Sequence, residues 1–176
     1  MMTQYLLTLM LFGALETASA LPRPIALQPG KISAPIASGV LTGGRADEEF
    51  TLLKITREAA RGGIEKWTIL YGDRQGKPIQ QQPGYYHLTV DRNSRRLVLD
   101  LAQVYKTAVD RKQLEKMTKA STVVAASEMV MDPQDRSTNL TLNMKSAVEV
   151  RVSAEESDEG KLVLLMKPVL PTKAVK

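Results

Sequence analysis

Residues 84–101, GYYHLTVDRNSRRLVLDL, alternate apolar and polar side chains on both sides of a short polar turn. The positions that share the apolar face are Tyr86, Leu88 and Val90 in the first arm and Leu97, Leu99 and Leu101 in the second. A period of two with one apolar face is typical of a half-buried strand. The turn sequence DRNS supplies Asp and Asn, which bond to their own backbone and tolerate left-handed conformations. We therefore predict a β-hairpin, and we expect the rest of the chain to pack around it.

Short apolar segments with the same alternation recur on both sides of this hairpin. They lie at residues 50–57, 64–71, 122–131, 138–144, 148–152 and 161–166. One short helix is expected at residues 111–119, because Asp110 can cap it and Leu114 and Met117 are three residues apart. The pattern predicts an all-β fold, an antiparallel β-sandwich of about eight short strands with one short helix. The polar segment 72–84 is expected to be a long loop.

The two ends of the chain differ from this alternating region. Residues 6–15 form an apolar run too short to span a bilayer, and Ala18-Ser19-Ala20 fits a small-x-small cleavage site. We therefore expect a signal peptide at 1–20 and a periplasmic or extracellular protein with no transmembrane segment after cleavage. Prolines at 22, 24, 29 and 35 predict a flexible linker without regular structure at 21–46. The β-sandwich domain is expected at 47–170, followed by a basic tail at 171–176.

The composition of the chain excludes several kinds of functional site. The 176 residues include no cysteine and one histidine, His87, so disulfides, thiol metal sites and multi-histidine metal sites are excluded. Gly76-Lys77 is followed by Pro78, which does not fit a phosphate-binding loop. We find no convincing catalytic constellation, and we predict neither an enzyme nor a cofactor. The formal charge of +5 fits either an ordinary solvated surface or a preference for an anionic partner.

Aromatic and basic side chains around the hairpin are the candidates for ligand binding. Tyr85 lies on the outward face beside the long loop, whereas Trp67 is expected in the core. Aromatic rings stack on sugar faces, and nearby cations hold anionic groups. The predicted binding residues are Tyr85, Arg96, Tyr71 and Lys77.

Residues 95–101, RRLVLDL, resemble the AMIN domain family, whose envelope modules precede N-acetylmuramoyl-L-alanine amidases and occur in secretins of type IV pilus systems. The resemblance extends over residues 49–168, with the second half at 138–144, 147–152 and 161–166. It implies a β-sandwich of two small sheets that localises its protein by binding peptidoglycan and has no catalytic residues of its own.

The expected function is therefore a non-catalytic, exported envelope module that binds peptidoglycan or another wall glycan and localises itself or a partner. The expected partner is peptidoglycan or an anionic wall polymer and not nucleic acid. The alternative is a protein–protein adaptor in a pilus or secretion assembly, because an exposed sheet edge can accept a partner strand.

Overall fold

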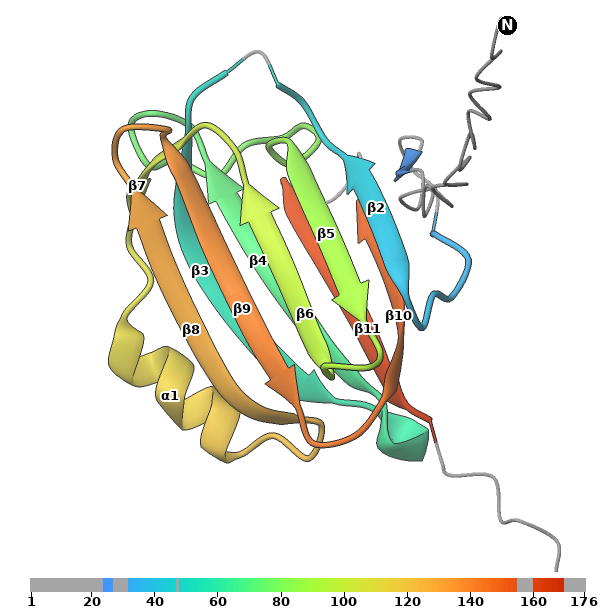
Figure 1. Cartoon of the computed structure of the whole chain (residues 1–176). Helices are drawn as coiled ribbons and strands as arrows, with labels where there is room; N and C mark the ends of the chain where they lie inside the picture. The colour runs from blue at the N-terminus through green and yellow to red at the C-terminus, as the bar shows by residue number, and fades with distance from the viewer. Residues whose placement is uncertain (1–23, 27–31, 47, 155–159, 170–176) are drawn as a thin grey trace, which may run out of the picture.

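Two β-sheets lie face to face around one hydrophobic core (Figure 1). The computed structural model describes residues 24–26, 32–46, 48–154 and 160–169. Sheet A has the order β1 (Ile25–Ala26), β2 (Gly39–Gly43), β5 (Tyr86–Asp91), β6 (Arg96–Leu101), β9 (Ser137–Met144) and β8 (Val124–Asp132). Sheet B has the order β10 (Val148–Ala154), β11 (Lys161–Pro168), β4 (Glu65–Gly72), β3 (Phe50–Ala59) and β7 (Val104–Thr107). The predicted β-rich fold with one helix is thus confirmed.

The predicted hairpin is β5 and β6, at the centre of sheet A. All six side chains assigned to its apolar face are buried, and Trp67 is fully buried in the facing sheet. In the turn, the Oδ1 atom of Asp91 accepts hydrogen bonds from the backbone N–H groups of Asn93 and Ser94. Arg95 then adopts a φ of 53°, which returns the chain into β6. The alternation and the turn chemistry therefore predicted this element correctly.

The sheets are mixed and not purely antiparallel, which corrects the expected architecture. Strand β1 pairs with β2 in parallel, and β3 pairs with β7 in parallel. Strands β1, β2 and β7 are the three that the sequence pattern did not predict, and the described residues form eleven strands, not eight. These three strands have only two to five residues each, which is too short for a period of two to be distinguished from chance.

The expectation that residues 21–46 lack regular structure is wrong for much of this segment. Residues 39–43 form β2, whose register with β5 pairs Leu41 with Leu88. The preceding residues also bond to sheet B: the N–H groups of Ser33 and Ile36 donate to the carbonyls of Val152 and Val150. Residues 32–43 satisfy backbone groups at one edge of each sheet, which outweighs the proline content there. The signal peptide predicted at 1–20 and the basic tail at 171–176 lie outside the described residues.

Helix α1 (Arg111–Lys119) packs beside β8, at the opposite side of the molecule from β2 (Figure 1). Its predicted cap is confirmed, because the Oδ1 atom of Asp110 accepts a hydrogen bond of 2.9 Å from the N–H of Lys112. Leu114 is buried and Met117 packs partly against the core, as their spacing predicted. The 3₁₀ turn η1 (Arg61–Gly63) joins β3 to β4.

Replacing Asp110 with alanine is expected to lower the free energy of unfolding by about 1 kcal/mol, since an N-terminal backbone donor loses its partner. Urea denaturation measures this change. Glu115→Ala, on the same helix but away from the cap, serves as the control and should change the free energy by less than about 0.5 kcal/mol. An equal effect of both substitutions would contradict a capping role for Asp110.

Candidate functional site

The first predicted binding residue, Tyr71, is part of the core. Its ring is fully buried and meets the ring of Phe50 edge-on, with centroids 5.8 Å apart and planes at 82°. Burial raises the pKa of its hydroxyl, and the nearby Tyr86 hydroxyl adds to the effect. Tyr71 thus presents no surface to a ligand, and we exclude it from the candidate site.

The remaining three predicted residues do not converge on one place. Tyr85 and Arg96 both lie on the outer face of sheet A, but Arg96 pairs with Asp91, six residues along β5 from Tyr85. At about 3.4 Å per residue, their backbones are about 20 Å apart. Lys77 is exposed in the loop after β4, where its N–H donates to the Oδ1 atom of Asp73 at 2.8 Å. The sequence therefore predicted residue types suited to binding without locating a shared site.

The outer face of sheet B carries an excess of positive charge. The alternation of β3, β4, β10 and β11 points five cations and two carboxylates away from the core. The cations are Lys54, Lys66, Arg151, Lys161 and Lys167, and the carboxylates are Glu58 and Glu149. Within this set, Lys66 and Glu58 form an ion pair at 3.9 Å. This face therefore suits an anionic partner better than a cationic one.

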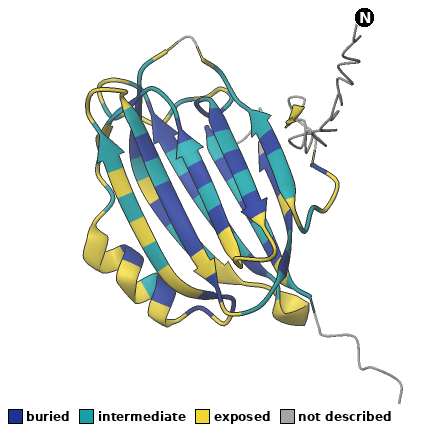
Figure 2. Cartoon of the chain, in the orientation of Figure 1, coloured by how far each residue is buried: buried dark blue, intermediate teal, exposed yellow. Residues whose placement is uncertain are grey.

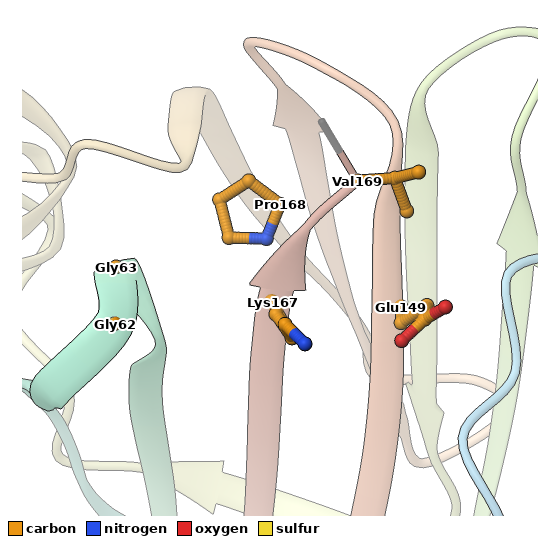
Figure 3. Close-up of a pocket in the computed structure, with 6 residues that line it drawn as sticks. All are labelled: Gly62, Gly63, Glu149, Lys167, Pro168 and Val169. Carbon is orange, nitrogen blue, oxygen red and sulfur yellow. The ribbon is translucent and has the colours of Figure 1, made fainter. Parts of the chain in front are cut away.

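Two adjoining hollows lie where β10 and β11 meet the η1 turn, and together we call them the sheet B groove. The larger, of about 380 Å³, is lined by Gly62, Gly63, Glu149, Lys167, Pro168 and Val169 (Figure 3). The smaller, of about 220 Å³, is lined by Pro35, Ile64, Glu149, Arg151, Leu165 and Lys167. Glu149 and Lys167 line both, so the two hollows lie side by side along the end of sheet B.

Strand register sets the chemistry of the sheet B groove. Glu149 is opposite Lys167 across the β10–β11 ladder, and Arg151 is opposite Leu165. Figure 3 shows Lys167 between the η1 turn and Glu149. Arg151 and Lys167 are exposed, whereas Leu165 is half-buried and forms an apolar floor. The groove thus combines two accessible cations, one carboxylate and an apolar surface, a set that can hold a chain bearing carboxylates and short aliphatic groups.

The η1 turn shapes one wall of the groove. Gly62 and Gly63 both have a φ of 73°, a conformation that glycine adopts without steric cost. No atom lies within 4 Å of where a β-carbon would stand on either residue, so the space beside this backbone is open. A ligand chain can therefore approach the turn closely.

The residues of the groove were not selected by sequence reasoning. Arg151 and Lys167 occupy outward positions of strands that the alternation did predict. The alternation predicts that these side chains point outward. It does not predict that β10 pairs with β11 or that η1 lies beside them. The signal available in the sequence was a cation at outward positions of these two predicted strands, Arg151 in one and Lys161 and Lys167 in the other.

The buried carboxylate of Glu65 does not resemble a catalytic acid. It is the one buried carboxyl group among the described residues, and its side chain is 1% exposed. It accepts hydrogen bonds from Trp67 Nε1 at 3.2 Å, Ser121 Oγ at 2.7 Å, and both the N–H and Oγ1 of Thr122 at 2.6 and 3.0 Å. The guanidinium of Arg57 adds an ion pair at 2.9 Å.

Burial alone would raise the pKa of Glu65, but the hydrogen bonds from Ser121, Thr122 and Trp67 outweigh it and hold the pKa below its usual value. A general acid near neutral pH needs a raised pKa. We therefore interpret Glu65 as a structural group that ties the segment after α1 to sheet B.

The described part of the chain contains no group of three or more His, Asp or Glu side chains placed to hold a metal ion. No helix among the described residues is long and apolar enough to cross a bilayer.

In comparisons with protein-family models, with curated proteins and with solved structures, the chain gives no match.

Proposed function

We propose that this chain is a non-catalytic, exported module of the bacterial envelope that binds peptidoglycan through the sheet B groove. The observation that carries the proposal is the groove itself, where Arg151 and Lys167 stand exposed beside the apolar floor formed by Leu165. The peptide stems of peptidoglycan carry carboxylates and short aliphatic side chains, so their chemistry complements this surface.

Three further points support the proposal. The apolar run at 6–15 with its cleavage pattern favours export. Two sheets packed around one core agree with the β-sandwich that the AMIN resemblance implies. The groove's charge supports an anionic partner in general, and the choice of peptidoglycan among such partners comes from the resemblance at residues 95–101.

Reversing the groove charges with R151E and K167E is expected to weaken binding to purified peptidoglycan sacculi at least tenfold. The change replaces two attractive contacts by repulsive ones, and each tenfold loss corresponds to about 1.4 kcal/mol. Co-sedimentation at increasing sacculus concentration measures the apparent affinity.

The matched control is the pair R92E and R96E in the β5–β6 hairpin, where both side chains are exposed on the other sheet. This control changes the net charge equally, and it includes the hairpin arginine first predicted to bind. Equal losses in both double variants would show that net charge alone governs retention and would overturn the groove. A loss confined to R92E and R96E would move the site to sheet A.

A second candidate function, a protein–protein adaptor, is favoured by one specific observation. Strand β8 is the last strand of sheet A and pairs only with β9, so its other edge is open among the described residues.

A further inference from the structure

The open edge of β8 offers unpaired backbone groups along seven residues. Its register with β9 runs from Val124 to Asp132. Apart from this ladder, no backbone–backbone hydrogen bond joins residues 125–131 to another described segment. In an antiparallel ladder, alternate residues direct their N–H and C=O groups away from the partner strand. Such a row is a template for an additional strand.

The outward side chains of β8 are acidic or apolar. Glu128 and Val130 are exposed, Val130 by 51%, and Asp132 continues the same row. Figure 2 shows exposed positions along β8, the strand at the edge of sheet A. Their neighbours across the ladder are Thr141, Asn139 and Ser137, which carry no charge. Neither carboxylate of this row makes an ion pair with a described residue. The Oδ1 atom of Asp132 accepts hydrogen bonds from the N–H groups of Gln134 and Asp135, which leaves its Oδ2 atom for a cation. The outward row of β8 is therefore acidic, apolar and acidic at Glu128, Val130 and Asp132, although the net charge of the protein is positive.

Helix α1 provides a second wall beside the inner side of this edge. The hydroxyls of Thr118 and Ser127 lie 2.6 Å apart and hold the helix against the strand. Between helix and strand is a hollow of about 230 Å³, lined by Arg111, Leu114, Glu115, Ser127, Glu128 and Met129. A strand added along β8 would place alternate side chains over this hollow, so the edge offers side-chain contacts as well as backbone hydrogen bonds.

The charges of β8 disfavour pairing with a second copy of itself. In an antiparallel pair centred on Val130, Glu128 of one copy would stand opposite Asp132 of the other. A parallel pair in register would place each carboxylate beside its own equivalent. Like charges directly opposite each other destabilise a ladder, whereas opposite charges contribute about 0.2–1 kcal/mol per pair. The edge of β8 is thus complementary to a strand with basic side chains opposite its two carboxylates and an apolar side chain between them.

We propose that β8 accepts an extended segment of a partner protein with the pattern basic–x–apolar–x–basic. The two basic side chains pair with Glu128 and Asp132, and the apolar side chain covers Val130. The intervening side chains lie toward α1 and Met129. This site is on the far side of the molecule from the sheet B groove, so it adds a protein-binding function that does not depend on peptidoglycan binding.

The test titrates the purified chain with a blocked nine-residue peptide that alternates threonine and valine and carries lysines two positions to either side of a central valine. Changes in the NMR chemical shifts of the backbone amides locate the binding site. A second peptide, with glutamates in place of both lysines, measures how much the charges contribute to the affinity. We expect shifts confined to β8 and α1, with affinity at least tenfold weaker for the glutamate peptide. Absence of shifts in β8 at millimolar lysine peptide, or equal binding of both peptides, would overturn the proposal.

Charge-reversed variants complete the test. The double variant E128K with D132K is expected to bind the glutamate peptide more tightly than the lysine peptide. The control D135K, in the adjacent turn, should still bind the lysine peptide more tightly. Dispersed amide spectra of each variant confirm that it is folded. Retention of the lysine preference in E128K with D132K would contradict the assigned row. Analytical ultracentrifugation without peptide measures the molar mass of the protein. A mass above that of one chain would mean that a second copy occupies the β8 edge, and this would overturn the proposal.

Discussion

Replacing Glu65 with alanine is expected to lower the free energy of unfolding by about 3–5 kcal/mol, because the guanidinium of Arg57 loses its buried partner. Four further donor groups, from Trp67, Ser121 and Thr122, lose their acceptor at the same time. Buried donors without a partner retain their full desolvation cost. Urea denaturation of wild type and variant measures the difference.

The matched control is Glu58→Ala on the same sheet. Glu58 pairs with Lys66 at 3.9 Å, and both side chains are exposed, so its loss should cost less than about 1 kcal/mol. Equal costs for the two substitutions would contradict a structural role for Glu65.

The stability contributed by Glu65 also depends on pH. Because its folded-state pKa is lowered, the contribution is fully present above the unfolded value of about 4.5 and is lost as pH falls through the folded value. The difference in unfolding free energy between wild type and Glu65→Gln should therefore shrink as the pH is lowered below about 4.5. A difference that is constant through this range would contradict an ionised Glu65 in the folded protein.

Replacing Gly44 with alanine is expected to cost about 2–5 kcal/mol of folding free energy, the sum of a left-handed backbone and an overpacked contact. Its φ is 84°, and a β-carbon there would stand 2.3 Å from the carbonyl oxygen of Gly84. That oxygen is backbone and cannot rotate away. The adjoining hydrogen bonds, from Arg45 N–H to the Pro83 carbonyl and from Tyr85 N–H to the Arg45 carbonyl, would be displaced with it.

The control Gly76→Ala separates the cost of the left-handed backbone from the cost of the steric contact. Gly76 has a nearly equal φ of 82°, but nothing lies within 4 Å of the position of its β-carbon. It should therefore show the backbone cost alone, about 1–2 kcal/mol. Thermal denaturation of both variants gives the comparison, and a Gly44→Ala effect no larger than that of Gly76→Ala would exclude the predicted clash.

The parts of the fold that could be predicted are those determined by local sequence. The β5–β6 hairpin has dense alternation and its own turn, and α1 has a cap and spaced apolar residues. Strands β1, β2 and β7 are ordered by partners that are distant in the sequence: β2 pairs with β5, and β7 pairs with β3. Backbone groups at a sheet edge induce such short strands, so their own composition carries little signal.

The candidate site was harder to predict than the fold. The hairpin register implied that Arg96 and Tyr85 lie at opposite ends of β5 and β6, and so argued against one site containing both. The groove combines residues from four separate segments, among them Pro35, Gly62 and Lys167, and only tertiary packing brings them together. Glu65 illustrates the same limit, because its donors at 57, 67, 121 and 122 converge only in the folded chain.

The most direct measurement is co-sedimentation of the purified protein with peptidoglycan sacculi at low and at physiological salt. Exposed cations alone are screened over about 8 Å at physiological ionic strength, whereas contacts with the apolar floor at Leu165 are not. We predict retention at both salt concentrations, with weaker affinity at the higher one. No retention at either concentration, or retention at low salt only, would contradict specific binding of peptidoglycan by the sheet B groove.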